Sequence, residues 1–304
     1  MTQKSGCISI HAGCSLSCPF CGGGNKPTPE SLRQQEIIAH KTLQEFKQRG
    51  VKQVDISSGD PIEYEHISEL IGYMKQEGFY VQLSTHGVGL ADKSLADKII
   101  TAGVDKLRIP IYGSCADIHD SVVGKKGSFK KTITGIKYAL KKNNKIELYT
   151  STLILQQNKN DLLKIIDLVN QLGSSYHTIG VPCLVTRDRS CSASFYLPFK
   201  DLPPYIKPVY QHIARTKQNI NFLEIPFCVF GEFNTIIASL SGPPDMGSYW
   251  KAAPDQQTED KDTPAYRKRK KIAMCDHCRY FNHCGGFYIN DIEEFGAGEL
   301  HPIK

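Results

Sequence analysis

Apolar and polar positions alternate with two different periods along the first two thirds of the chain. Short apolar segments predict β-strands at 7–11, 51–56, 80–84, 106–111, 146–153 and 177–181. Between them, segments with apolar residues three or four positions apart predict α-helices at 29–49, 62–77, 93–101, 129–142 and 161–172. Such regular alternation predicts an α/β fold with a parallel sheet.

Six β/α repeats fit a partial (β/α)6 barrel of the TIM type, in which functional residues lie on the loops after the strands. We assign residues 1–215 to this barrel. After about residue 190 the alternation ends, and we expect a short strand at 222–230 and a long exposed loop at 241–271. Residues 216–304 are therefore expected to form a small, cysteine-rich second domain.

The composition and charge of the chain exclude several classes of function. The chain has 304 residues and a net charge of +6, which is too weak to indicate a nucleic-acid partner, and we interpret the basic run at 267–271 as a solvated charge run. No apolar leader precedes the first strand and no apolar stretch could span a bilayer, so we expect no membrane partner and a cytoplasmic location. In a reducing compartment, the 11 cysteines are expected to serve metal or redox chemistry.

The first candidate site is a loop with the spacing C-x3-C-x2-C, formed by Cys14, Cys18 and Cys21 and followed by three glycines. Three thiolates on one loop can hold three irons of a cubic [4Fe–4S] cluster and leave the fourth iron open to a ligand. A zinc site or three buried thiols is the alternative, although zinc sites prefer four ligands and C-x2-C pairs.

This spacing, with an aromatic residue before the last cysteine, resembles the signature of the radical S-adenosylmethionine (SAM) enzymes. The resemblance implies that the open iron binds SAM, and that reductive cleavage yields a 5′-deoxyadenosyl radical that abstracts hydrogen from a substrate. It also implies a flavodoxin- or ferredoxin-type electron donor.

Further blocks carry the same resemblance. Ser58, Gly59 and Asp60 resemble the family's G-G-E-P segment, with Asp60 in place of the longer glutamate, and 84–87 is similar to its T-N-G. Residues 107–129 resemble a block common in radical SAM peptide maturases, where Pro110 replaces a serine that contacts the SAM ribose. The SAM-binding residues implied in this way are Phe20, Ser58, Gly59, Asp60, Thr85 and Ser151. We interpret His119 and Asp120 as a capped loop rather than an acid–base pair.

A second constellation has the spacing C-x2-C-x5-C, formed by Cys275, Cys278 and Cys284, with Cys228 as a fourth ligand. Four thiolates would close a [4Fe–4S] cluster, as a structural site or an electron relay, and on spacing alone zinc competes evenly. The pattern resembles the auxiliary-cluster region of SPASM and Twitch radical SAM enzymes, and four cysteines match the single-cluster Twitch type better. His277 and His283 are expected to face solvent.

The leading hypothesis is a radical SAM oxidoreductase that modifies a ribosomally synthesised peptide. The alternatives are a small-molecule radical SAM dehydrogenase or epimerase acting on a sugar or aminocyclitol, and a non-catalytic zinc- or iron-binding protein. An epimerase would need a hydrogen donor, for which the candidates are Cys115, Cys183 and Cys191. No other catalytic residue is assigned.

Overall fold

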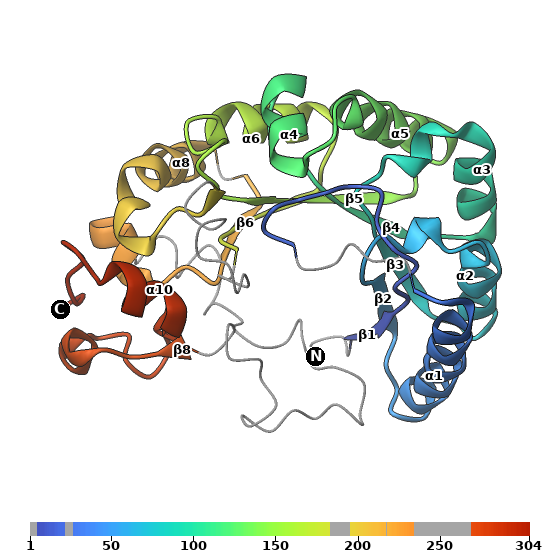
Figure 1. Cartoon of the computed structure of the whole chain (residues 1–304), viewed down its shortest axis with the longest axis horizontal. Coiled ribbons are helices and arrows are strands. Elements are labelled where there is room, and N and C mark those ends of the chain that lie inside the picture. Colours follow the sequence, from blue (N-terminus) through green and yellow to red (C-terminus); the bar gives the residue numbers. More distant parts are fainter. Residues whose placement is uncertain (1–4, 22–26, 183–194, 217, 234–268) are drawn as a thin grey trace.

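The computed structural model describes residues 5–21, 27–182, 195–216, 218–233 and 269–304. Seven parallel strands follow one another in chain order and curve into a half-barrel, with the helices along its outer face (Figure 1). The strands are β1 Ser5–Ser9, β2 Gln53–Ser57, β3 Tyr80–Ser84, β4 Lys106–Pro110, β5 Glu147–Leu153, β6 Tyr176–Gly180 and β7 Ile220–Leu223.

The predicted α/β partial barrel is confirmed, with seven strands in place of six. The outer helices are α1 Pro29–Gln48, α2 Ile67–Gln76, α3 Lys93–Ala102, α4 Ala116–Val123, α5 Ser128–Lys142, α6 Leu162–Gln171 and α8 Pro203–Thr216. The strand predicted at 222–230 was too long. It ends at Leu223, because Glu224 has a positive φ and Pro226 cannot donate to a strand partner, and η4 Phe227–Phe233 follows.

The two faces of the sheet differ in chemistry because side chains alternate along each strand. Toward the helices lie apolar residues such as Ile56, Leu83 and Leu107, which are almost completely buried. On the other face the strand register aligns Cys7 with Asp55, and Ser84 with Arg108. The inner face of the half-barrel is therefore polar over β1–β4.

The C-terminal segment packs against the last strands of the half-barrel. It contains the antiparallel pair β8 Arg269–Lys270 and β9 Phe287–Tyr288, followed by α10 Ile289–Phe295. Phe287 and Tyr288 share one hydrophobic core with residues of β6, β7 and α8. The boundary placed at residue 215 falls within the last turn of α8, just before β7, and the division into two domains stays a prediction. None of the helices in the described ranges is long and apolar enough to cross a membrane.

Candidate functional site

A cavity of about 280 Å³ opens where the C-terminal ends of the strands meet the loop after β1. The loop contributes Cys14, Cys18 and Cys21 to its lining, and the strand ends contribute hydroxyl, imidazole and charged groups. In a parallel α/β sheet this edge is where functional residues gather. The three cysteines of the first motif are thus brought to one wall of one cavity.

The thiols of this loop influence one another electrostatically. Burial raises the pKa of Cys18 to about 12, and the nearby thiols of Cys21 and Cys14 contribute to the increase.

Aromatic side chains form the wall beside the loop. The ring of Phe20 lies edge-on to that of Tyr112, with 5.4 Å between centroids, and to that of Phe195, at 6.3 Å. Phe195 was not anticipated, because it lies beyond the predicted strands in a segment without regular periodicity. This apolar wall limits the access of water to one side of the cavity.

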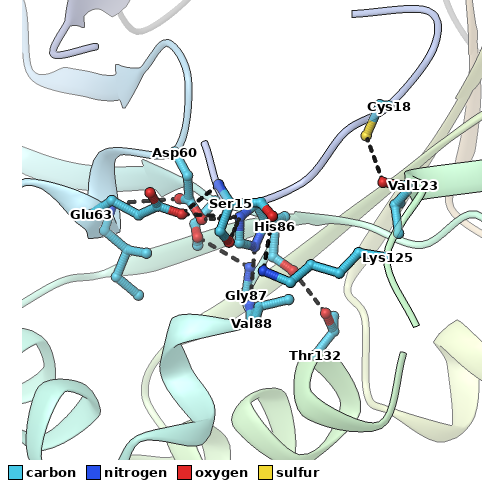
Figure 2. A network of polar contacts seen from close by, with 12 residues as sticks. Ser15, Cys18, Asp60, Glu63, His86, Gly87, Val88, Val123, Lys125 and Thr132 are labelled. Carbon is cyan, nitrogen blue, oxygen red and sulfur yellow. Dashed lines mark hydrogen bonds and ion pairs between the residues drawn. The ribbon is translucent and has the colours of Figure 1, made fainter. Parts of the chain in front are cut away.

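Four of the SAM-binding residues expected beyond the loop line the cavity: Ser58, Gly59, Thr85 and Ser151. Asp60, by contrast, does not line the cavity. Its carboxylate is fully buried behind His86, with Oδ2 2.7 Å from His86 Nε2, and Oδ1 accepts a hydrogen bond from the Ile62 N–H (Figure 2). It is His86 that lines the cavity at this point. A contact between Asp60 and SAM stays a prediction, and the structure places His86 nearer to the cavity.

Within the strands themselves, polar residues that no sequence motif indicated also line the cavity: Asp55 of β2, Ser84 of β3 and Arg108 of β4. Ser84 donates a hydrogen bond to Asp55 (2.8 Å), and Arg108 lies in register with Ser84 on the neighbouring strand. Burial raises the pKa of Asp55 to about 6, although the Ser84 hydrogen bond and the charge of Arg108 oppose the increase. The polar residues alternating within β2, β3 and β4 were the signal that could have identified this group.

Cys7 is a second cavity residue that no sequence motif indicated. Its thiol lines the same cavity and lies 3.1 Å from the hydroxyl of Ser57. Burial and the charge of Asp55 raise its pKa to about 11, so the sulfur keeps its proton at neutral pH. Of the hydrogen-donor candidates, Cys115 is an exposed residue at the start of α4 and does not line the cavity. Cys183 and Cys191 lie outside the described residues.

His119 and Asp120 form a capped loop, as expected. Tyr112 N–H donates to His119 Nδ1, and burial lowers the pKa of His119 to about 4. Asp120 accepts hydrogen bonds from the backbone N–H groups of Gly127 and Phe129 at the start of α5. These contacts use the polar atoms of His119 and Asp120 for structure, and neither residue lines the cavity.

The second constellation also comes together. Cys228, Cys275, Cys278 and Cys284 line one small cavity of about 20 Å³, enclosed by aromatic side chains including Phe227, which stacks on Tyr280. Burial raises the pKa of Cys228 to about 12, and the thiols of the other three cysteines add to the increase. The Gly286 N–H points at the sulfur of Cys284 (3.4 Å). His277 and His283 are exposed and do not line this cavity.

The chain matches a family model, a curated protein and several solved structures. A family model described as Radical SAM superfamily matches residues 8–169. The AdoMet-dependent heme synthase of Methanosarcina barkeri is 28% identical over 169 residues, which are 55% of this chain and 48% of that protein. The chain thus spans about half the length of this curated relative.

Among solved structures, Streptococcus suis SuiB bound to S-adenosylmethionine has a TM-score of 0.62 at 17% identity, covering 99% of this chain and 76% of SuiB. The enzyme anSMEcpe with bound AdoMet and Cp18Cys peptide has a TM-score of 0.63 at 16% identity, covering 98% of this chain and 92% of the other. At these identities the likeness shows a shared fold.

Proposed function

The chain belongs to the radical SAM superfamily, and from this membership we propose an oxidoreductase that cleaves SAM reductively and abstracts hydrogen from a ribosomally synthesised peptide. The observation that carries the proposal is the cavity shared by Cys14, Cys18, Cys21 and the polar ends of the strands. A three-thiol set beside a ligand-sized cavity is the arrangement that an open iron requires.

The first site fits a [4Fe–4S] cluster. Cys14, Cys18 and Cys21 would hold three of its irons, since their three soft sulfur ligands come from one loop and line one cavity. When bound, the cluster and SAM supply a 5′-deoxyadenosyl radical to the cavity. The electron would come from a flavodoxin- or ferredoxin-type donor.

The protein's own residues hold SAM and shape the space for the substrate. Ser58, Gly59, Thr85 and Ser151 lie along the cavity where they can bind the polar parts of SAM, and Phe20 and Tyr112 exclude water beside the loop. Orientation of this kind supplies much of the rate in reactions between two bound groups.

Asp55 is suited to accept a proton. Its pKa near 6 leaves it ionised at neutral pH but able to take up a proton from a neighbouring group. A net two-electron oxidation of the substrate releases one proton, and the carboxylate of Asp55 is placed in the cavity to receive it.

We propose that the second constellation, Cys228, Cys275, Cys278 and Cys284, holds an auxiliary [4Fe–4S] cluster of the Twitch type. Four thiolates would leave no open iron, so the group would serve as an electron relay or a structural centre. Support for iron over zinc comes from the C-x2-C-x5-C spacing, which resembles the auxiliary-cluster region of SPASM and Twitch radical SAM enzymes.

A peptide substrate is supported by the fold. SuiB bound to its precursor peptide SuiA has a TM-score of 0.63 over 99% of this chain, and anSMEcpe was also solved with a peptide. The second candidate is a small-molecule dehydrogenase or epimerase acting on a sugar or aminocyclitol. The polar inner face around Asp55 and Arg108, with the Cys7 thiol beside it, favours this alternative.

Anaerobic reconstitution tests the proposal. We expect about eight irons per chain if both sites hold [4Fe–4S] clusters, and about four irons with one zinc if the second site binds zinc. The reduced protein should convert SAM to 5′-deoxyadenosine, and absence of this product would show that the proposed activity is wrong. Mass spectrometry of a peptide encoded beside this gene, incubated with protein and SAM, then separates peptide modification from small-molecule chemistry.

A further inference from the structure

The cysteine loop is held by contacts that converge on one residue, Ser15, which lies between Cys14 and Cys18. The Ser15 N–H donates to Glu63 Oε1 at 2.6 Å, and Lys125 Nζ donates to the Ser15 carbonyl oxygen at 2.9 Å (Figure 2). One charged side chain thus binds each main-chain polar group of Ser15. Hydrogen bonds with a charged partner are stronger than those between neutral groups.

These two side chains come from opposite sides of the loop. Glu63 ends the short helix η1 Pro61–Glu63 after β2, and Lys125 follows α4. Beside Lys125, the Ser17 N–H donates to the carbonyl oxygen of Val123 at 3.0 Å. The loop is therefore attached to two segments that the half-barrel itself positions.

On the Glu63 side the attachment is backed by His86. The imidazole Nε2 lies 2.7 Å from Asp60 Oδ2, 3.8 Å from Glu63 Oε1 and 3.5 Å from the Ser15 hydroxyl. The carbonyl oxygen of His86 accepts a hydrogen bond from Thr132 of α5 at 2.9 Å. Glu63 therefore rests against a residue that is itself tied to a helix.

Such restraint has a purpose at this position. Three cysteines that bind one cluster must be held at fixed positions on their loop. Fixing a loop costs conformational entropy. Contacts formed by other residues can meet this cost before any metal binds.

We propose that Glu63 and Lys125, named here the Ser15 clamp, are positioning residues that fix the cysteine loop in its metal-binding conformation before the cluster forms. We also propose that the ammonium group of Lys125, next to the loop, stabilises the reduced cluster, which carries one more negative charge than the oxidised one. Neither role needs contact with SAM or substrate. Both rest on the first cluster of the proposed function, but the first can be tested without it.

Amide hydrogen exchange of the reduced, iron-free protein tests the positioning role. Glu63→Gln and Lys125→Met should each accelerate exchange in the segment 14–18 by roughly tenfold, the effect of losing one charge-assisted hydrogen bond. The matched controls are Glu65→Gln and Lys126→Met, which alter exposed neighbours of the same charge and should leave exchange unchanged. Unchanged exchange in both clamp variants would overturn the proposal, whether or not the protein binds iron.

Reconstituted protein tests the electrostatic role. The midpoint potential of the SAM-sensitive paramagnetic signal should become more negative in Lys125→Met, and Lys125→Arg should restore it because the charge returns. An unchanged potential in Lys125→Met would overturn this role. Circular dichroism of each variant, compared with the wild type, separates loss of the clamp from loss of the fold. If the wild type binds no iron, the proposed function is contradicted, but the result of the hydrogen-exchange experiment still stands.

Discussion

The two cysteine sites differ in how open they are and in how the chain assembles them. The first has three thiols on one short loop and faces a cavity of about 280 Å³ lined with polar groups. The second has four thiols around a space of about 20 Å³ enclosed by aromatic side chains. Three ligands with an open cavity suit a site that binds a further molecule, whereas four ligands in an enclosed space suit electron transfer or structure.

The two sites also differ in which parts of the chain supply their cysteines. Residues 14–21 contain the complete first set, so the half-barrel needs only to hold that loop. The second set joins Cys228 after β7 to three cysteines near the C-terminus, so it forms only when the C-terminal segment docks. Loss of a cysteine should therefore affect chemistry at the first site, and both docking and metal content at the second.

The largest effect is expected from removing one thiol at each site. Cys18→Ala should reduce 5′-deoxyadenosine formation to the level of a protein-free control, because two thiols cannot hold the open cluster. Cys278→Ala should lose about four irons but still convert SAM, since the second site does not bind it. Iron analysis and chromatography of the reaction products measure both effects.

The control for both substitutions is Cys115→Ala, because Cys115 is exposed and belongs to neither set. Its iron content and SAM cleavage should equal those of the wild type. Complete loss of SAM cleavage in a folded Cys278→Ala protein would contradict the separation of roles between the two sites.

A smaller effect is expected from adding one methyl group at a glycine beside each site. Gly59 has a φ of +57°, and a Cβ there would overlap the carbonyl oxygen of Gly13 ahead of the cysteine loop. Gly286 has a φ of +80°, and a Cβ would overlap the carbonyl oxygen of Lys270. Each alanine should cost roughly 2 to 4 kcal/mol locally through strain and crowding.

The two glycine variants should differ in which irons they lose. Gly59→Ala should lower SAM-dependent product and the SAM-sensitive paramagnetic signal, and Gly286→Ala should lower the iron of the second site alone. Gly50→Ala is the control for positive φ without crowding, since no atom lies within 4 Å of the added methyl group. If all three variants behave alike, the close approach of backbone is not what shapes the two sites.

Much of the fold followed from the sequence because its strands are short, apolar on the helix side and separated by clear helices. The strand predicted at 80–84 coincides with β3, and the helix predicted at 161–172 contains α6 Leu162–Gln171. The seventh strand was misplaced because β7 Ile220–Leu223 has only four residues and is followed closely by Pro226. Periodicity over so few positions cannot distinguish a strand from an apolar turn.

The cysteine sets could be predicted because spacing along the chain reports metal ligands directly. The polar inner face was not predicted, because Asp55, Arg108 and Cys7 come from three strands and only the sheet register brings them together. The alternation of polar residues within the strands was the signal for this face. The burial of Asp60 behind His86 also depends on contacts between separate loops. Residue type at a motif position therefore did not reveal which side chain reaches the cavity.

A pH-dependent effect tests how firmly the C-terminal region is joined to the half-barrel. Asp291 of α10 is fully buried and accepts a hydrogen bond from the Tyr196 hydroxyl at 2.6 Å. Burial raises its pKa from 3.8 to about 6. Because the folded state then binds the proton more tightly than the unfolded state, this group stabilises the fold below pH 4, and the contribution is lost as pH rises through about 6.

The expected loss is roughly 2 to 3 kcal/mol, from a shift of about two pKa units. Asp291→Asn should remove it, so the difference in unfolding free energy between wild type and variant should change between pH 4 and 6.5 and stay constant above. Denaturant unfolding at several pH values measures this difference, and the exposed Asp117→Asn is the control. A constant difference across the range would show that Asp291 does not couple the two regions.

The smallest effect concerns Cys7. Its thiol lines the cavity of the first site but belongs to neither set of metal-binding cysteines. In D2O the Cys7 sulfur carries deuterium. Without substrate, this deuterium atom can pass to the 5′ carbon derived from SAM, so that a C–D bond forms and the S–D bond breaks. The external reductant then reduces the sulfur radical that remains. Deuterium in 5′-deoxyadenosine should therefore fall by a factor of a few in Cys7→Ala and not in Cys115→Ala, measured by mass spectrometry in thiol-free buffer. Equal deuterium incorporation in both variants would show that the Cys7 thiol does not reach the 5′ carbon. The epimerase alternative would then be weakened, because Cys7 is the thiol of the described residues proposed here as hydrogen donor.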